Sequence, residues 1–521
     1  MPSFVPSRRS WGALALATAL FTAGFAIANR FQLTHGVLYR LAANDWPNAA
    51  GNFLLLAVQA LALLAALFLL GRKLFVAAMA LAFASILVSL GYGQTVDDVL
   101  SAGTLSWMTV EARQAANAAG EFAAPLVSAG LQSGLAVALF VGARVFLERG
   151  RWLTPGWIAG AGGVALLLAP SLLAVSLGLP ASAAERNIYS LGYEVATAAP
   201  SPPREPVVLE PDTRNAPTHI VWLVDESIAY RPFQEIVAPR LAGIEHVDFG
   251  MTASLGHCSA PSNLALRAGV DVRHAGPATD LRRTPSIWGY ARKAGYRTVL
   301  IDGQTSGAPQ NLLLPPELAL IDEVVPAAGS LDTDREIASR INQQLRGDGR
   351  TFTYAVLRGV HFQYRDHYPA GLIPADSASH RQYRTAVEYS KRGFFDRLLA
   401  GVDRRDVAVV YTSDHGQNLT EGAVPHCSAA AVPAELHVPL LAFLPERLAE
   451  AYAQAPRAGH SASQIFPATL IWMGYDRAAV QGRYDRDLTR PPARYVRFDR
   501  NVVPLRSGDA IDVSVSSGFP G

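Results

Sequence analysis

Three short polar clusters in the second half of the chain carry the residue types that metal-assisted group transfer requires. Asp-Glu-Ser at 225–227 follows an apolar run, Ser-Ala-Pro-Ser at 259–262 resembles a helix start, and Ser-Asp-His-Gly at 413–416 follows another apolar run. Carboxylates and an imidazole can hold a divalent cation, and a hydroxyl can act as a nucleophile. The clusters therefore predict transfer of a phosphoryl or sulfuryl group.

The elements around these clusters alternate between strand-like and helix-like patterns. Apolar or β-branched runs of strand length occupy 220–224, 298–301, 353–357, 407–411 and 440–443, and helical patterns occupy 286–294, 333–345 and 383–399. This alternation predicts an α/β domain with a largely parallel central sheet. In such a sheet, functional groups gather at the carboxyl ends of the strands, which is where two of the clusters stand.

Ser259 is the candidate nucleophile. Pro261 favours a helix start at this position, and the free backbone N–H groups of a helix N-terminus favour an anion there. A plain helix-capping serine is the commoner role of such a residue. Cys258 is a rival nucleophile, although a thiolate suits acyl chemistry better than phosphoryl chemistry.

A single divalent metal ion is predicted at Glu226, Ser259, Asp414 and His415. The pairing of Asp414 with His415 suits zinc, with manganese as the alternative. Asp225 is either a further ligand or a residue that orients its loop. Any one of these carboxylates alone could be a helix cap or a solvated loop residue, but several such pairs at strand ends are improbable by chance.

Three histidines are candidates for binding a substrate phosphate or assisting proton transfer. His361 follows the strand-like run at 353–357, His426 lies ten residues beyond Gly416, and His367 is close to His361 in the chain. For each of them the competing interpretation is an ordinary surface or core histidine.

The first 180 residues have the composition of a membrane domain. Five uncharged segments of roughly 20 residues can each span a bilayer, and they occupy 11–29, 51–70, 74–92, 122–143 and 156–177. Arginine and lysine residues before the first segment, between the second and third, and after the fourth predict that the N-terminus is cytoplasmic. The soluble half is then outside, as is the loop 93–121 with Glu111. A cleaved signal peptide is the alternative for the first segment.

Composition limits the remaining possibilities. The net charge is +2 and there is no Lys/Arg-rich run, which argues against nucleic acid as a partner. The only two cysteines, Cys258 and Cys427, neighbour two candidate site residues, and an oxidising compartment would permit a bridge between them. We expect a transmembrane domain at 1–180, a Pro-rich linker at 181–217 and a catalytic domain at 218–521.

At these residues the chain resembles the alkaline phosphatase superfamily, and within it the membrane-bound phosphoethanolamine transferases that modify lipid A. The segment from Ser259 to Gly269 matches the sulfatase signature in outline, but Asn263 stands where formylglycine-forming sulfatases have Arg. Glu226 and the Ser-Asp-His-Gly at 413–416 are similar to the metal-binding residues of the transferases. Thr-Val-Glu-Ala at 109–112 is similar to a motif in their outer loop.

The resemblance implies an inner-membrane, zinc-dependent enzyme with a periplasmic sulfatase-like domain. It would move a phosphoethanolamine-like group from a phospholipid to lipid A or an envelope glycan through a phospho-serine at Ser259. Glu226, Asp414 and His415 would hold the metal with Ser259, while substrate binding would use His361, His426, His367 and Glu111. The alternatives are a sulfatase-like hydrolase, a phosphodiesterase or a glycerol-phosphate transferase of the same superfamily, or a non-catalytic envelope protein that binds lipid or glycan.

Overall fold

The computed structural model describes most of the chain, which divides into two compact units, residues 1–198 and 199–521. The described residues are 10–42, 46–96, 99–100, 105, 123–153, 156–176, 183–197, 201–276, 279–305, 309, 311–327, 329–421, 423, 425–427, 432–498 and 510–512. Glu111 lies outside these residues.

The first unit is helical. Its helices are α1 (Trp11–Ala28), α2 (Arg30–Leu33), η1 (Thr34–Leu38), α3 (Tyr39–Ala42), α4 (Trp46–Leu69), α5 (Arg72–Val96), α8 (Ala123–Arg149), α9 (Trp157–Ser176) and α10 (Asn187–Thr197). The last of these falls within the segment that we expected to be a linker. The shortest helices, α2 and α3, flank the single π-helical segment η1 among the described residues.

Four of the described helices, α1, α4, α5 and α8, are long and apolar enough to cross a membrane. The fifth predicted span forms α9, but Pro170 stands inside this helix and its apolar stretch up to Pro170 is shorter than the others. The predicted count of five spans is therefore not confirmed. Hydropathy along the sequence shows no interruption at this proline, because the residues on either side of it are apolar.

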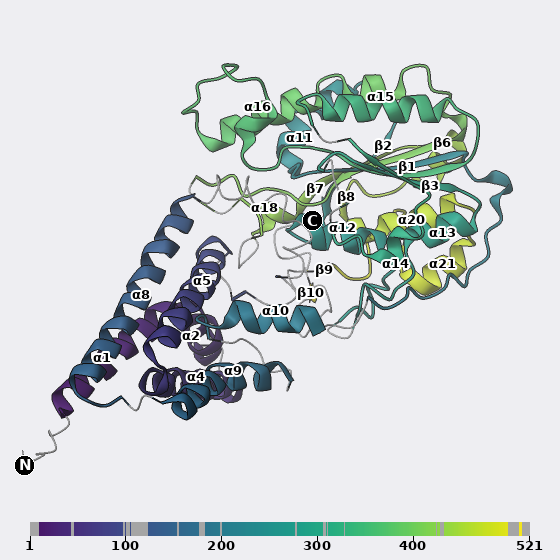
Figure 1. Cartoon of the computed structure of the whole chain (residues 1–521). Coiled ribbons are helices and arrows are strands. Elements are labelled where there is room, and N and C mark those ends of the chain that lie inside the picture. The colour runs from purple at the N-terminus through teal and green to yellow at the C-terminus, as the bar shows by residue number, and fades with distance from the viewer. Residues whose placement is uncertain are drawn as a thin grey trace, which may run out of the picture. The chain divides into compact units, whose positions relative to one another are not determined.

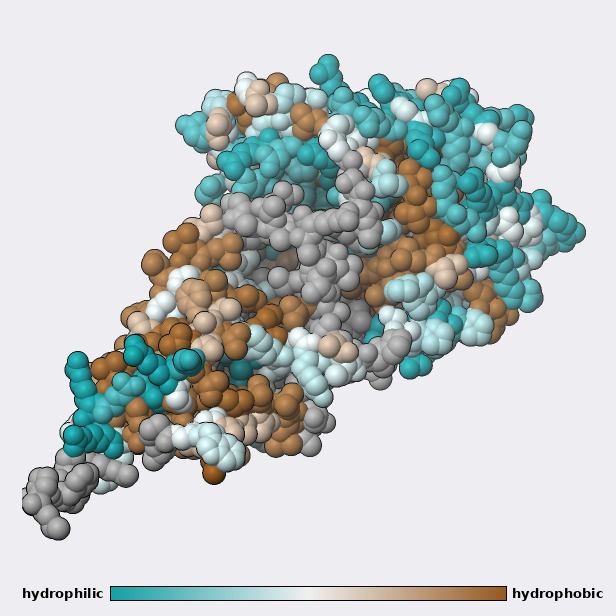
Figure 2. Space-filling model, in the orientation of Figure 1, coloured by the Kyte–Doolittle hydropathy of each residue, from teal (hydrophilic) through white to brown (hydrophobic). Residues whose placement is uncertain are grey.

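Large apolar side chains are exposed on the helical unit (Figure 2). Trp11, Leu61, Leu131 and Trp157 are each more than 60% exposed, which would be unfavourable in water. A lipid environment removes that cost, because hydrocarbon tails replace water around these side chains. The exposed apolar surface thus agrees with a membrane setting for this unit.

The second unit is built on an eight-stranded sheet in the order β4-β3-β5-β1-β6-β7-β2-β8. The strands are β1 (His219–Asp225), β2 (Val247–Ala253), β3 (Arg297–Asp302), β4 (Glu323–Pro326), β5 (Thr351–Val356), β6 (Val407–Ser413), β7 (His437–Phe443) and β8 (Ala458–Ser461). A separate hairpin pairs β9 (Val496–Phe498) with β10 (Ala510–Asp512). Every residue of the central strand β1 is buried, as expected for a strand covered on both faces.

Helices cover both faces of this sheet (Figure 1). One layer contains α11 (Tyr230–Ile236), α15 (Thr333–Leu345), α16 (Ser379–Lys391) and α17 (Phe394–Leu399). The other contains α12 (Ser259–Arg267), α13 (Ile287–Lys293), α14 (Pro315–Leu318), α20 (Ile465–Trp472) and α21 (Arg477–Tyr484). The short α18 (Pro433–Leu436) and α19 (Glu446–Ala449) flank β7 along the chain.

The α/β architecture confirms the predicted fold in outline, with three differences. The sheet is mixed, because β7 runs antiparallel to both β6 and β2. The predicted helix 383–399 is two helices, separated at Gly393, whose φ of 66° is a left-handed conformation that suits glycine. The strands β2, β4 and β8 were not predicted, since none of them carries a long apolar run.

The carboxyl ends of β1, β5 and β6 meet at one edge of the sheet. The register pairs Asp225 with Ser413 and Val224 with Val356. Just beyond β5, the backbone N–H of Val360 donates to the Glu226 carbonyl at 3.0 Å. Gly359 has φ 55°, and a Cβ there would lie 2.3 Å from the Glu226 carbonyl oxygen. Only glycine allows these two loops to approach so closely.

Gly359→Ala should therefore disturb the edge at which Glu226 stands. We expect the free energy of unfolding to fall by more than about 2 kcal/mol, because left-handed strain and a backbone overlap act together. Gly371→Ala is the matched control, since Gly371 has φ 86° but open space where an added Cβ would stand. It should cost about 1–2 kcal/mol in a chemical denaturation experiment. Equal losses for the two variants would contradict the close approach.

Candidate metal and nucleophile site

Glu226, Asp414 and His415 meet where β1 and β6 end. The His415 Nε2 atom lies 3.5 Å from Glu226 Oε1 and 3.7 Å from Asp414 Oδ2. One ligand atom from each residue lies within 4.8 Å of the others, and all three side chains are buried. The parallel pairing of β1 with β6 produces this cluster, because residues that follow the two strands emerge side by side.

Ser259 joins this cluster from the first position of α12. Its hydroxyl donates to Glu226 Oε1 at 3.0 Å and lies 3.2 Å from His415 Nε2. The capping position before the helix is occupied by Cys258, whose side chain makes no capping bond. Ser259 is therefore not a helix cap in the usual sense. Its hydroxyl is turned to the acidic cluster instead of to the backbone of its own helix.

The residues present fit a divalent cation. Asp414 Oδ1 accepts from the backbone N–H groups of Ser227 at 3.0 Å and His415 at 2.7 Å. The other oxygen, Asp414 Oδ2, is buried with no hydrogen-bond partner. A buried unpaired carboxylate oxygen is costly, and a cation held between Asp414, Glu226 and His415 would satisfy it. The mixture of oxygen and imidazole donors suits zinc.

The pKa shifts of the three clustered residues also indicate that the site lacks positive charge. Burial, followed by the neighbouring charge of Glu226, raises the pKa of Asp414 to about 8. Burial would lower the pKa of His415, but the charges of Asp414 and Glu226 outweigh it and raise this pKa to about 9. Burial would likewise raise the pKa of Glu226, yet the hydrogen bond and charges of the nearby histidines lower it. A bound cation would take over the role of these protons.

Asp225 is directed to a different partner. Its Oδ2 atom lies 2.6 Å from Nζ of the fully buried Lys391 and accepts from Tyr411 Oη at 2.6 Å. Lys391 also lies 2.8 Å from Asp334. Asp334 in turn accepts from the backbone N–H of Arg358 at 2.7 Å. Asp225 thus orients its loop, the second of the two roles left open by the sequence, and Lys391 connects it to the loop after β5.

His361 and His426 lie next to the acidic cluster. The His426 ring stacks on His415 with centroids 4.6 Å apart, and it meets His361 edge-on at 5.0 Å. His426 Nδ1 lies 3.1 Å from Gln417 Oε1. Burial, followed by the positive charges of His415 and His361, holds the pKa of His426 well below its usual value. His426 is therefore a neutral imidazole at neutral pH.

His367 has a more enclosed position, in the short helix η5 (Tyr364–His367). It is buried and its Nδ1 atom has no hydrogen-bond partner. Burial, together with the charges of Arg358 and His361, lowers the pKa of His367 to about 3. Its environment is therefore that of a neutral core histidine within electrostatic range of His361.

Cys258 and Cys427 form a disulfide, with their Cα atoms 5.0 Å apart. The expectation that they lie close in space is confirmed. The bond joins the start of the Ser259 helix to the residue after His426, and it leaves no thiol at position 258 to compete as a nucleophile. The backbone N–H of Cys427 also donates to the His257 carbonyl at 2.9 Å, which holds the same two segments together.

Gln304 is a site residue whose contact the sequence did not predict. Its amide Nε2 donates to Glu226 Oε2, the oxygen that Ser259 does not use. Asn311 Nδ2 donates to Gln304 Oε1 at 3.1 Å and so fixes which end of the amide faces Glu226. Gln304 follows β3 in the same way that Glu226 follows β1, and this strand-end position was the available signal.

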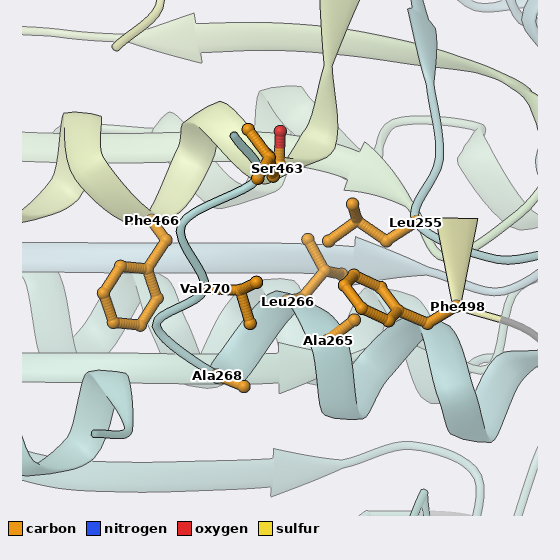
Figure 3. A pocket seen from close by; sticks show the side chains of 9 residues that line it. Leu255, Ala265, Leu266, Ala268, Val270, Ser463, Phe466 and Phe498 are labelled. Carbon is orange, nitrogen blue, oxygen red and sulfur yellow. The ribbon is translucent and has the colours of Figure 1, made fainter. Parts of the chain in front are cut away.

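A small cavity lies beside the far end of α12 (Figure 3). Its volume is about 10 Å³, which is room for one water molecule at most. All but one of the residues that line it are of apolar type, and they are Leu255, Ala265, Leu266, Ala268, Val270, Val272, Ser463, Phe466 and Phe498. It offers no charged group for a phosphate and is a packing defect of the core.

Comparison with known proteins supports the expected family. Residues 241–475 match the sulfatase family, a span that contains Ser259, Asp414 and His415 but begins after Glu226. A comparison with curated protein sequences found no match. The predicted resemblance is thus supported by a family match over the catalytic half of the chain.

Two solved structures extend this picture. The integral membrane protein lipooligosaccharide phosphoethanolamine transferase A from Neisseria meningitidis has a TM-score of 0.55 and 13% identity, covering 91% of this chain and 97% of that chain. At this identity the likeness establishes the fold. The C-terminal periplasmic domain of EcEptC from Escherichia coli, in complex with Zn, has 16% identity, covers 59% of this chain and 96% of that chain, and has a TM-score of 0.48, too low to establish more.

Replacing one candidate ligand should release the metal. Asp414→Asn removes a negative charge and should weaken zinc affinity by at least about 100-fold, because a neutral amide is a poor zinc ligand. Competition with a chromophoric chelator measures this change. Asp403→Asn is the control, since Asp403 forms only an exposed ion pair with Arg405. Unchanged zinc affinity in Asp414→Asn would show that this carboxylate is not a ligand.

The stability of the second unit should depend on His367 at mildly acidic pH. The unfolded chain protonates this histidine near pH 6.5, whereas the folded state resists protonation until about pH 3. Unfolded protein therefore binds more protons in this window, and stability falls as pH falls below about 6.5. His367→Gln should flatten the decrease of melting temperature between pH 7.5 and 5, measured by tryptophan fluorescence. His274→Gln, at an exposed histidine, should leave the slope unaltered.

Proposed function

We propose that this protein transfers a phosphoethanolamine-like group, because residues 241–475 match the sulfatase family and 91% of the chain shares the fold of a phosphoethanolamine transferase. The donor is a phospholipid and the acceptor is lipid A or an envelope glycan. The observation that carries the proposal is the Ser259 hydroxyl, which is bonded to Glu226 and placed at the start of α12.

In the first step Ser259 Oγ attacks the donor phosphorus. Its proton passes to a neutral histidine beside the cluster, while the bond from phosphorus to the glycerol oxygen breaks. The leaving diacylglycerol oxygen takes up that proton from the histidine and departs. Ser259 then carries the phosphoethanolamine group as a phosphodiester, and the backbone N–H groups at the start of α12 favour its negative charge.

A divalent cation, most suitably zinc, would lower the pKa of the Ser259 hydroxyl and offset charge on the phosphoryl oxygens when bound. Glu226, Asp414 and His415 would hold it together with Ser259. Asp414 Oδ2 supports this assignment, since it is buried and unpaired.

His361 and His426 are proposed to bind the phosphate oxygens and to move protons in both steps. They adjoin the cluster, with His426 stacked on His415. In the second step an acceptor hydroxyl attacks the phosphorus, loses its proton to a neutral histidine, and displaces Ser259, whose oxygen takes up that proton. Two chemical steps through one covalent intermediate should give ping-pong kinetics. His367 is assigned a supporting role behind His361.

A membrane-embedded helical unit supports a phospholipid as the donor. Four helices with the length and composition of membrane spans would keep the enzyme at the surface where such a substrate resides. We propose an inner-membrane location with the second unit in the periplasm, in agreement with the charge bias of the sequence. Glu111 in the outer loop is proposed to pair with the ammonium group of the donor.

Ser259→Ala tests the central step. The full-length protein in detergent micelles should release labelled diacylglycerol from phosphatidylethanolamine, and the variant should lose at least about 10³-fold in rate because it lacks the nucleophile. Ser339→Ala, which removes a hydroxyl from α15, is the control and should retain the rate. Mass spectrometry of the unaltered protein without acceptor should find added phosphoethanolamine on the Ser259 peptide.

The acceptor separates a transferase from a hydrolase. Lipid A should speed diacylglycerol release and gain the phosphoethanolamine group itself. Free phosphoethanolamine formed at one rate with and without lipid A would identify water as the acceptor and overturn the transferase proposal. Full diacylglycerol release by Ser259→Ala would instead overturn the assigned nucleophile.

A further inference from the structure

Arg204 lies near the beginning of the second unit, and its side chain is 6% exposed. Its Nη2 atom donates to Glu317 Oε2 at 2.6 Å. Its Nη1 atom donates to the carbonyls of Leu281 at 2.8 Å and Thr284 at 3.1 Å. Nothing in the sequence pattern had marked this arginine as functional.

Glu317 lies between two guanidinium groups. Its side chain is completely buried, and its second oxygen accepts from Arg267 Nε at 3.0 Å. Arg267 belongs to α12, the helix that begins with Ser259. Since each carboxylate oxygen serves a different arginine, neither arginine pairs with both oxygens. Arg267 consequently has a further N–H group to use elsewhere.

That group of Arg267, Nη2, donates to the backbone carbonyl of Asn311 at 2.8 Å. The Asn311 side chain then donates to Gln304 Oε1 at 3.1 Å, and Gln304 Nε2 donates to Glu226 Oε2. A continuous series of polar contacts thus runs from Arg204 to the candidate metal ligand. Arg267 thus holds the Asn311 backbone, and the Asn311 side chain sets which end of the Gln304 amide faces Glu226, because an amide oxygen accepts and an amide nitrogen donates.

We propose that Arg204 is a remote positioning residue for Glu226, acting through Glu317, Arg267, Asn311 and Gln304. The inference rests on the proposed metal site. Without Arg204, Glu317 Oε2 loses its partner and the Arg267 guanidinium turns to bind both carboxylate oxygens, as such pairs prefer. The Asn311 carbonyl then loses its donor, the Gln304 amide is no longer fixed, and Glu226 binds a cation less well.

The alternative is that Arg204 only packs the start of the unit, in which case its loss lowers stability without acting on the metal. Zinc affinity separates the two roles, because outer groups that orient a ligand typically contribute about 10–100-fold to metal affinity. A double-substitution cycle then tests whether the effect travels through Gln304.

The experiment uses the full-length protein in detergent, stripped of metal and titrated with zinc against a chromophoric chelator at fixed pH. Arg204→Gln should weaken zinc affinity about 10-fold and Gln304→Leu by about 10–100-fold. In the Gln304→Leu background, Arg204→Gln should have no further effect, because the connection is already cut. Arg214→Gln is the matched control, since it removes the same charge from an exposed ion pair with Asp212.

If Arg204→Gln does not fold, Arg204→Lys gives the same test. A lysine retains the charge beside Glu317 but cannot also reach both carbonyls, so zinc affinity should fall by less, and again only when Gln304 is present. Zinc affinity within about twofold of the original for these variants, or independent effects of Arg204 and Gln304 substitutions, overturns the inference alone. No zinc binding by the unaltered protein would overturn the proposed function and the inference with it.

Discussion

Two carboxylates, Glu226 and Asp414, are buried within a few ångströms of each other. Many of the surrounding groups offset the free-energy cost of this arrangement. Like charges in a dry environment repel strongly, and each also loses its water. The raised pKa of Asp414 is a direct sign of that unfavourable balance. Hydrogen-bond donors around the two carboxylates offset part of this cost. Ser259 and Gln304 donate to Glu226, and backbone N–H groups donate to Asp414. What remains without a hydrogen bond is one oxygen of Asp414, which a bound cation would satisfy.

Around this centre the protein uses other buried charges to hold its loops. Lys391 contacts both Asp225 and Asp334 and so joins the loop after β1 to the loop after β5. On the opposite side of the sheet, Glu317 joins Arg204 to Arg267. Each arrangement contains one central charge with two partners of opposite sign. Removing either central group would leave two buried like charges facing each other, so both arrangements make the site dependent on residues far from the reacting atoms.

Much of the site could be predicted from the sequence, because its key residues follow strands. Glu226 and Asp414 stand directly after apolar runs, and parallel strands bring such positions to one edge. Lys391 could not be found in this way, since a single lysine in an amphipathic helix usually faces solvent. Its burial depends on how α16 packs on the sheet. Gln304 also stands just after a strand, but its side chain is an uncharged amide, a type that does not by itself indicate a site residue. The fifth span is not confirmed, because its helix contains Pro170, over which hydropathy averages.

The disulfide between Cys258 and Cys427 has a consequence for when the enzyme is complete. It joins segments 169 residues apart, one leading into the nucleophile helix and the other bearing His426. A newly made chain in a reducing compartment would carry two free thiols and a His426 segment without its covalent attachment. If the second unit is periplasmic, as proposed, the bond would form only after export, and oxidation would then fix the two segments of the site together. The chain would thus be made with an incomplete site and completed only in the oxidising compartment.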